Sequence, residues 1–487
     1  MNSLEEYFHP FYEEIIGQKE TFHSPYGKKT ILYADWTASG RLYAPIEEKI
    51  SYQFGPFVAN THTESNITGK MMTVFYKEAR DIIKSHVHAD DTYALLLEGK
   101  GMTGALCKLQ RILGLSFHEG IKQTLSLPEK ERPVVFITHM EHHSNQTSWE
   151  ETIADVVIIP PDDRGQVCTS SLSQRLSEFN DRPLKIGAFT ACSNVTGIQT
   201  DYHHLAKIMH QHGGLCFVDF SASAPYVAMD VKPKNPAEKL DAIFFSPHKF
   251  LGGPSSTGIA IFSKHLYANS IPDHPGGGTV NWTNPWGEKS YLQDIEARED
   301  GGTPGFLQAI RTALAIKLKE KMDIDKIEKR ENELVHLLFE RLEENKRVII
   351  LEGQYKTRLP ILSFYVEGIH HNLFVKLLND VHGVQARGGC ACAGTYGHYL
   401  LKIGLSQSKQ ITAEVDKGNT FIKPGWVRIS LHPTMKNLEV HYIADSIFDI
   451  IENIETYQRD YMYDEEIGEF RHRVKDSYVW GGDWFEV

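Results

Sequence analysis

The sequence predicts an α/β fold, with a large domain built on a mainly parallel sheet and a smaller C-terminal α+β domain. Short apolar runs alternate with helix-like segments up to residue 262, which is typical of a parallel sheet covered on both faces. From Val348 onward, short strands surround one helix-like segment. A chain of 487 residues exceeds a single typical core, so two domains are expected.

The expected domain boundaries follow these changes in pattern. Residues 1–30 are polar with aromatic anchors and predict an N-terminal helical segment. The large domain is expected at 31–325 and the small one at 326–460. The tail at 461–487 is acidic and aromatic, with Trp480 and Trp484 close to its end, and its role is unknown.

The composition limits the classes of protein to which this chain can belong. Hydrophobic residues make up 41% and charged residues 23%, which is ordinary for a globular protein. A net charge of -12 without a basic run argues against a nucleic-acid partner. We expect no membrane contact, because no apolar run approaches the roughly 20 residues that cross a bilayer. The acidic N-terminus is no secretory signal, and six cysteines form no disulfide framework, so a cytoplasmic protein is expected.

The individual elements are predicted from apolar runs and from helix boundary signals. Strands are expected at 31–33, 93–97, 134–138, 155–160, 186–190, 215–219, 348–351, 361–366 and 426–431, and in the run that ends at Phe245. Helices are expected at 202–211, 304–322 and 372–379, with Pro304 as the first residue of the second. Residues 114–132 are polar and predict a surface excursion.

Lys249 is the first candidate for chemistry, because it directly follows the strand that ends at Phe245. Desolvation favours the neutral lysine, and a neutral amine condenses with an aldehyde. Pyridoxal phosphate (PLP) is the usual aldehyde partner of such a lysine. The alternative is a loop lysine that faces water.

Two further strand ends carry polar residues. Asp219 ends the run at 215–219 and could pair with a protonated pyridine nitrogen, although a turn former is the commoner use of an aspartate there. Asn194 follows the run at 186–190. Because open α/β sheets bind ligands beyond the carboxyl ends of their strands, these strand ends predict one shared crevice.

Three motifs carry a resemblance to a known family. Ser-Asn-Val-Thr-Gly at 193–197, Val-Asp at 218–219 and Ser-Pro-His-Lys at 246–249 resemble the class V aminotransferase family, and within it the cysteine desulfurase and selenocysteine lyase branch. The resemblance runs from about Tyr33 to about Pro433. It implies a PLP-dependent lyase or transferase of fold type I.

The resemblance implies one role for each motif residue. Lys249 would hold PLP and move the α-proton, Asp219 would keep the ring nitrogen protonated, and His142 would stack on the ring. Asn194 would meet the phenolic oxygen. The residues implied for the phosphate are Gly101, Met102, Thr103, Ser246 and His248.

The glycines at 99–104 support the phosphate role, because they follow an apolar run and precede a helix-like segment, whose N-terminus favours anions. Lys100 departs from the small residue expected there. Thr279 lies in a later glycine-rich loop, at 274–279, which in the family reaches the phosphate of the neighbouring subunit. This implies a homodimer with shared active sites.

A second chemical centre is expected around Cys390 and Cys392, in a glycine-rich stretch that follows Arg387. A nearby cation favours a thiolate, which could attack the sulfur of a bound cysteine. In the resembled branch the nucleophile lies five residues after an arginine, and Cys392 has this position relative to Arg387. The Arg-x-Gly-Cys-x-Cys pattern also resembles molybdenum-cofactor sulfurases. A metal-binding pair would need a second pair nearby, so no metal is expected. The pair could also be structural, and either cysteine could be the nucleophile.

Two other residues refine the expected activity. Arg428 lies among apolar neighbours on the strand at 426–431, and by resemblance it holds the substrate carboxylate. Ala222 stands where the resembled desulfurases carry a glutamine that bonds the phenolic oxygen, so Ser221 or Ser223 would have to substitute.

The sequence therefore predicts a PLP-dependent cysteine desulfurase or selenocysteine lyase that acts on a small amino acid, with a sulfur-acceptor protein as a possible partner. One alternative is a class V aminotransferase or amino-acid epimerase that needs no cysteine nucleophile. Another is a sulfur-carrier or scaffold protein that turns over only with a partner.

Overall fold

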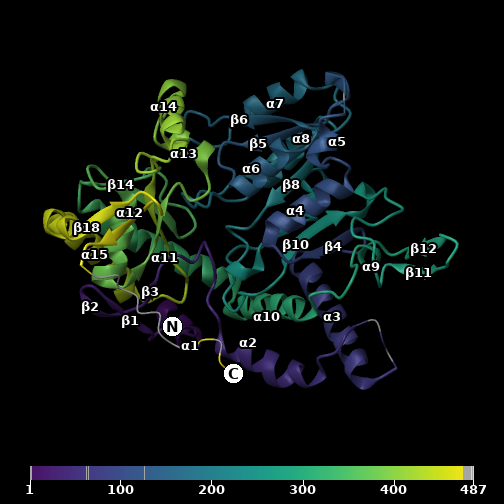
Figure 1. Cartoon of the computed structure of the whole chain (residues 1–487), viewed down its shortest axis with the longest axis horizontal. Helices are drawn as coiled ribbons and strands as arrows, with labels where there is room; N and C mark the ends of the chain where they lie inside the picture. Colours follow the sequence, from purple (N-terminus) through teal and green to yellow (C-terminus); the bar gives the residue numbers. More distant parts are fainter. Residues whose placement is uncertain are drawn as a thin grey trace. The chain divides into compact units, whose positions relative to one another are not determined.

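The computed structural model describes residues 3–61, 63, 65–125, 127–474, 484 and 486. These residues form two compact units (Figure 1). We call residues 1–37, 194–198 and 329–487 the small unit, and residues 38–193 and 199–328 the large unit. The domain boundaries expected from the sequence stay predictions. The compact units themselves place the N-terminal 37 residues with the C-terminal segment.

The large unit is built on a seven-stranded sheet in the order β4-β10-β9-β8-β7-β5-β6. From β9 to β6 all neighbouring strands are parallel, while β10 is antiparallel to both of its neighbours. The expected α/β class with a mainly parallel sheet is confirmed. The strands are β4 (Tyr93–Glu98), β5 (Val134–Thr138), β6 (Asp155–Ile159), β7 (Lys185–Thr190), β8 (Leu215–Asp219), β9 (Ala242–Phe245) and β10 (Gly258–Ser263).

Helices cover both faces of this sheet because its strands are apolar on both sides. Tyr93 and Leu95 pack into one core, and Ala94 and Leu96 into the other, as the alternation of side chains along a strand requires. The first core is closed by α3 (Ile67–His86), α7 (Thr169–Glu178), α8 (Tyr202–Gln211) and α10 (Phe306–Met322). The second core is closed by α4 (Gly101–Ile112) and α6 (His143–Glu150).

Shorter elements complete the large unit: α2 (Ala44–Glu48), α5 (Glu119–Lys122), α9 (Ile295–Arg298) and the hairpin β11 (Val280–Thr283) and β12 (Lys289–Tyr291). The helix α8 has the predicted bounds. The predicted start of α10 at Pro304 is wrong. Gly305 is the N-cap and Phe306 the first helical residue, so Pro304 precedes the helix.

The small unit contains a four-stranded antiparallel sheet in the order β13-β14-β17-β16. Its strands are β13 (Val348–Ile350), β14 (Ile361–Val366), β16 (Arg387–Gly389) and β17 (Trp426–Ser430). Its helices are α1 (Leu4–Glu13), α12 (His371–His382), α13 (Gly394–Leu400), α14 (Leu405–Val415) and α15 (Asn437–Tyr457), and α11 (Ile324–Glu343) contains the division between the units.

Backbone hydrogen bonds join the N-terminal segment to the rest of the small unit. The strand β3 (Leu32–Tyr33) pairs with β15 (Val384–Gln385). Ala34 accepts a hydrogen bond from the backbone N–H of Ser430 at the end of β17. This pairing places Asp35 beside β17.

Two hairpins flank these elements, β1 (Thr21–Ser24) with β2 (Gly27–Thr30), and β18 (Tyr461–Asp464) with β19 (Glu469–His472). The second hairpin lies within the expected tail. Residues 480–483 of the tail, and His62 of the segment that resembles the family's Asn-x-His, lie outside the described residues.

Candidate active site

In the large unit, polar groups meet at the carboxyl ends of adjacent strands, as the sequence predicts. The sheet order places β8 between β7 and β9, and Asp219 lies opposite Thr190 and Phe244 in the register. Lys249 follows β9 in a short 3-10 turn. Because Asp219 pairs with Phe244 of β9, Asp219 and Lys249 lie at the same edge of the sheet.

The carboxylate of Asp219 is buried and held by the backbone. Its Oδ1 accepts a hydrogen bond from the N–H of Ser221 at 2.8 Å. Burial raises the pKa of Asp219 above its ordinary value, and Ser221 and Lys249 oppose this shift. A buried carboxylate at this position can pair with a pyridinium nitrogen.

Glu141 is a second buried carboxylate, and it was not among the residues predicted from the sequence. Its Oε1 accepts hydrogen bonds from the backbone N–H groups of Thr138 and Thr190, at 3.2 and 2.9 Å, and Oε2 accepts one from Asn145. These bonds tie the ends of β5 and β7 together. Burial, with a smaller contribution from the charge of Asp219, raises the pKa of Glu141 to about 7. Its neighbour His142 is the only local signal that could have drawn attention to it.

His142 is the N-cap of α6, and its ring is half-buried. The Nδ1 atom accepts a hydrogen bond from the N–H of Ser144 at 3.1 Å. A neutral ring in this arrangement carries its proton on Nε2. The cap therefore fixes both the orientation and the tautomer that a stacking ring would need.

The N-terminus of α4 fits a phosphate group. The side chain of its N-cap residue, Lys100, makes no capping hydrogen bond, and the N–H of Met102 donates instead to the Oγ of Ser246 at 2.9 Å. Gly101 has a φ of 63°, and a Cβ there would meet Ser246 at 3.2 Å and His248 at 3.4 Å. Backbone N–H groups at a helix start, with a hydroxyl beside them, form a typical anion cradle. Burial lowers the pKa of His248 to about 4, so its ring is neutral at pH 7.

Two other predicted phosphate residues bond within the large unit. The hydroxyl of Thr103 lies 2.8 Å from that of Ser144. Thr279 is buried, and its hydroxyl donates to the carbonyl of Gly276 in the same loop at 2.7 Å. The role predicted for Thr279 toward a neighbouring subunit stays a prediction.

Glycines shape the loop around Lys249. A Cβ on Gly40 would lie 1.9 Å from the carbonyl oxygen of Phe250, and one on Gly253 would lie 1.9 Å from that of Pro247. The N–H of Gly40 also donates to the carbonyl of His248. Only residues without a side chain fit at these two positions, which explains the small residues that follow Trp36.

In the small unit, Asp35 holds two arginines. Its Oδ1 accepts a hydrogen bond from Arg428 at 2.7 Å, and its Oδ2 accepts one from Arg387 at 3.0 Å. Arg428 also donates to the backbone oxygen of Asn194 at 3.1 Å. Within the described part of the chain, its buried Nε has no hydrogen-bond partner. Burial lowers the pKa of Arg428, and the charge of Asp35 opposes this shift. Asn194 connects this arginine to Ala391, the neighbour of Cys392, through its backbone oxygen and its side-chain amide.

Both cysteines of the second centre lie on one exposed turn, residues 390–393, which we call the cysteine turn. The carbonyl of Cys390 accepts a hydrogen bond from the N–H of Ala393 at 3.0 Å. Ala391 and Cys392 have φ of 49° and 57°, in the left-handed region that residues with side chains rarely adopt. The turn is therefore strained at both of its central residues.

Asn194 holds this turn. Its Nδ2 donates to the carbonyl of Ala391 at 2.7 Å, so its amide fixes the strained peptide. Its buried Oδ1 has no hydrogen-bond partner among the residues that the structure describes. The role predicted for Asn194 toward a cofactor stays a prediction. Its hydrogen bond to the cysteine turn was not predicted from the sequence.

The residues after Asp219 form a tight turn around Ala222. Ala222 is buried, and the hydroxyl of Ser223 donates to the carbonyl of Phe220 at 3.4 Å. Ser221 contributes its N–H to Asp219. Which serine would substitute for the family's glutamine stays open.

The described residues contain no cluster of three or more His, Cys, Asp or Glu side chains able to hold a metal ion. Over the same part of the chain, no helix is both long and apolar enough to span a membrane.

The fold and these two sets of residues define an α/β protein of the PLP-dependent transferase class. Residues 32–443 match the family model described as aminotransferase class-V. The chain belongs to the class V aminotransferase family, whose members are PLP-dependent enzymes. The expected family and enzyme class are confirmed.

Curated relatives carry a consistent name. A probable cysteine desulfurase of Halalkalibacterium halodurans is 27% identical over 367 residues, which cover 74% of this chain and 84% of the relative. One from Halobacterium salinarum is 27% identical over 372 residues, covering 75% and 83%. The expected similarity to cysteine desulfurases is confirmed.

Solved structures agree in fold. The apo cysteine desulfurase of Thermococcus onnurineus is similar with a TM-score of 0.70 and 23% identity, covering 87% of this chain and 95% of that one. The cysteine desulfurase CsdA of Escherichia coli, in an S-sulfonic acid form, has a TM-score of 0.66 and 21% identity, covering 86% and 94%.

Proposed function

We propose that this chain is a PLP-dependent cysteine desulfurase that converts cysteine to alanine and leaves the sulfur on Cys392 as a persulfide. The observation that carries the proposal is Cys392 itself, an exposed thiol near the buried Arg428, in a chain whose curated relatives are named probable cysteine desulfurases. Selenocysteine is the alternative substrate of the same site.

When bound, PLP supplies an electron-withdrawing ring that stabilises negative charge on the carbon atoms of an amino acid. Different residues would bind the aldehyde, the ring nitrogen and the phosphate of PLP. Lys249 would bind its aldehyde and Asp219 its ring nitrogen, and the start of α4 with Ser246 and His248 would bind its phosphate. His142, with Nε2 protonated, would cover the ring.

Lys249 is also suited to move protons. It follows a buried strand and lies at the same edge of the sheet as Asp219. A lysine amine in such a place accepts the α-proton of the substrate and returns it to the product carbon.

Cys392 would act on the substrate's sulfur. Its thiolate forms an S–S bond to that sulfur, and the bond between carbon and sulfur breaks. The carbon keeps the electron pair and takes up a proton, which gives alanine. The exposure of Cys392 on a turn gives the thiol access to a substrate.

Arg428 would bind the substrate carboxylate. Asp35 holds one of its terminal nitrogens, and its Nε is buried with no hydrogen-bond partner among the described residues. A guanidinium fixed by one carboxylate keeps N–H groups for a second one.

We also propose a cytoplasmic homodimer that passes sulfur to an acceptor. The six cysteines, all in the described part of the chain, are free thiols, which suits a reducing compartment. The hairpin β11–β12 exposes Trp282 and Trp286, at 51% and 84% of their surface, and such exposed aromatic rings suit a contact with a second subunit.

The experiment that tests the function is an assay of alanine and sulfide from L-cysteine with the PLP-loaded protein and dithiothreitol. Equal amounts of both products are expected from the wild type. Cys392→Ser should lose both, and Cys168→Ser, which changes another accessible thiol, should keep them. If the wild type forms neither product and transfers or racemises another amino acid instead, the aminotransferase or epimerase alternative holds.

A further inference from the structure

The small unit contains a pocket of about 520 Å³, which the proposed roles do not use. Strands β16 and β17, helices α12, α13 and α14, and the hairpin β18–β19 contribute to its walls. The apolar wall residues are Leu401, Ile403, Ile411, Val415, Trp426 and Ile467. Small-molecule sites commonly have volumes of about 300–1,000 Å³ and mostly apolar walls, so this pocket has the size of a ligand site.

The helix α14 presents one face to this pocket. Ser408, Ile411, Thr412 and Val415 line it, and their spacing of three and four residues places them on the same side of the helix. No residue of α14 is buried. The apolar side of the helix therefore lies against the pocket instead of a packed core, and a bound molecule would cover it.

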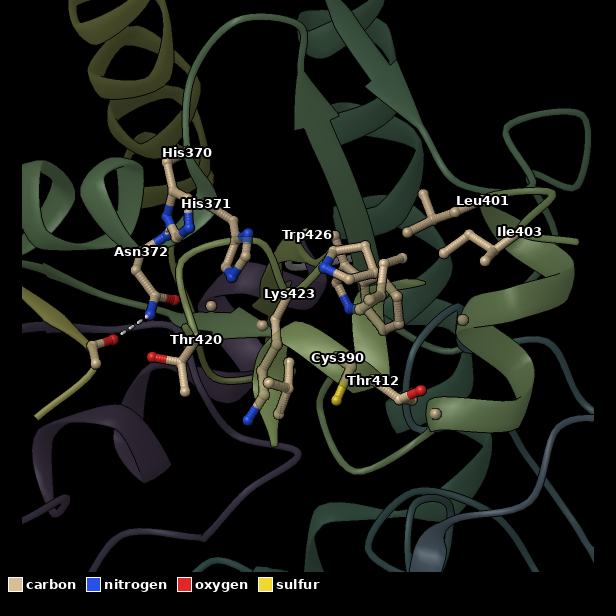
Figure 2. Close-up of a pocket in the computed structure, with 18 of the residues that line it drawn as sticks. His370, His371, Asn372, Cys390, Leu401, Ile403, Thr412, Thr420, Lys423 and Trp426 are labelled. Carbon is tan, nitrogen blue, oxygen red and sulfur yellow. Dashed lines mark hydrogen bonds between the residues drawn. The ribbon is translucent and has the colours of Figure 1, made fainter. Parts of the chain in front are cut away.

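Cys390 lies in the wall of this pocket, between Lys423 and Thr412 (Figure 2). Among the described residues, the lining includes Cys390 and does not include Cys392. The two thiols are two residues apart on the cysteine turn, so their Cα atoms lie within roughly 7 Å of each other. A thiol that faces the pocket is thus held close to the thiol proposed to receive sulfur.

Polar and charged groups also line the pocket. The ring of His371 stacks on that of His370, with 4.3 Å between the ring centroids. Burial lowers the pKa of His371 to about 4, so the ring is neutral at pH 7. Lys423 brings a cation, while Asp416 and Glu469 bring anions. These groups suit a small molecule that carries charges of both signs.

We propose that Cys390 is a second sulfur carrier, which takes the sulfur from Cys392 and passes it to a low-molecular-weight zwitterionic thiol bound in this pocket. The proposal rests on the proposed desulfurase function and names the route by which sulfur leaves. A concave pocket of this volume fits a whole small thiol, whereas a protein acceptor would need a far larger surface.

Both transfer steps balance without an oxidant or a reductant. The Cys390 thiolate attacks the outer sulfur of the Cys392 persulfide, and a new S–S bond forms on Cys390. The old S–S bond breaks, and its electron pair stays on Cys392, which takes up a proton. The acceptor thiolate then attacks the outer sulfur on Cys390 in the same way, and Cys390 returns to a thiol.

The first test follows the sulfur on the PLP-loaded enzyme, with glutathione as the acceptor. After one turnover, alkylation and fragmentation mass spectrometry should find the added sulfur on both Cys392 and Cys390 of the wild type. In Cys390→Ser, the first turnover should still give one alanine per subunit with sulfur on Cys392 alone. Its steady-state turnover with glutathione should fall at least tenfold, while Cys168→Ser should stay within twofold of the wild type.

The second test fills the pocket without touching either thiol. Ile411→Trp places a large ring on the side of α14 that lines the pocket, and Gln410→Trp places the same ring on an exposed neighbour outside the lining. The first variant should raise the KM for glutathione at least fivefold with an unchanged alanine burst. The second variant should not change it by more than twofold.

The outcomes separate the two proposals. A wild type that forms no alanine would contradict the desulfurase function, and the relay with it. If alanine forms but sulfur never reaches Cys390, or if Cys390→Ser keeps full turnover with glutathione, the relay alone is wrong. Equal KM values in the two tryptophan variants would exclude the pocket as the acceptor site.

Discussion

Two regions of this molecule hold their reactive groups in opposite ways. In the large unit, Asp219 and Glu141 are buried, and each accepts hydrogen bonds from backbone N–H groups. In the small unit, the cysteine turn is exposed and strained, and one side-chain amide from Asn194 holds its central peptide. The buried carboxylates are held in position at the ends of the strands, whereas the thiol proposed to carry sulfur lies on an exposed turn.

The energetic reasons differ in the same way. Burying a carboxylate is costly unless hydrogen bonds replace its water, and the ends of parallel strands supply free N–H groups for this purpose. Left-handed residues with side chains cost about 1 kcal/mol or more each, and they persist only where neighbours hold them. The first region should therefore respond to substitutions through charge, and the second through backbone conformation.

The largest effect expected in the buried region is that of Lys249→Ala. This variant loses both the amine proposed to hold PLP and the proton carrier, so alanine formation from L-cysteine should fall by about 10⁴-fold or more. The bound cofactor should also leave the protein on dialysis. Lys77→Ala removes an exposed lysine on α3 and serves as the control. If Lys249→Ala keeps more than a tenth of the wild-type rate, the site built around Asp219 is not the reactive one.

Asp35→Asn tests the ion network beside the cysteine turn. The substitution leaves Arg428, which is buried, without its negatively charged partner, and breaking a buried ion pair typically costs about 3 kcal/mol. We expect a clear fall in the Tm of the holoenzyme, together with a higher KM for cysteine.

Asp445→Asn is the matched control for that substitution, because Asp445 pairs with Arg341 at 2.6 Å but is 63% exposed. Surface pairs contribute less than about 1 kcal/mol, so its effect on Tm should be small. Equal shifts in both variants would contradict the buried network.

Glu141→Gln tests the buried carboxylate through pH. The pKa of Glu141 rises from its ordinary value of 4.5 to about 7 in the folded protein, so the folded state binds a proton that the unfolded state has released. The stabilisation is complete below about pH 4.5 and is lost as the pH rises to 7, a change of roughly 3 kcal/mol.

Calorimetry of the wild type and Glu141→Gln from pH 5 to 8 measures this change. The Tm of the wild type should fall relative to that of the variant as the pH rises. Glu150→Gln, an exposed residue on α6, should show no such trend. A constant difference in Tm across this range would mean that Glu141 titrates at its ordinary pKa.

The sequence predicted the regular parts of this molecule well, because apolar runs report strands directly. The strands at 134–138, 215–219 and 361–366 match β5, β8 and β14, and the strand-end positions of Asp219 and Lys249 follow from them. The start of α10 was missed because Pro304 and Gly305 are both common at helix starts.

The missed features depend on contacts between distant residues. Glu141 accepts a hydrogen bond from the N–H of Thr190, at the end of another strand. Asp35 accepts hydrogen bonds from two arginines, one on β16 and one on β17. Nor does the sequence indicate that Asn194 holds the cysteine turn or that Cys390 lines a pocket. These contacts between distant residues produce no periodic pattern in the sequence, so the spacing of residues does not predict them.

The smallest expected effect, that of Ala391→Gly, tests the strained region directly. Glycine adopts a φ of 49° without steric cost, so the variant should gain about 0.5 kcal/mol of stability after the larger entropy of its unfolded chain is subtracted. Ala413→Gly, at an exposed position inside α14, should instead lose about 0.5–1 kcal/mol. Calorimetry should therefore give Tm shifts of opposite sign. Two shifts of the same negative sign would mean that the cysteine turn stores no strain, and the contrast between the two regions would rest on burial alone.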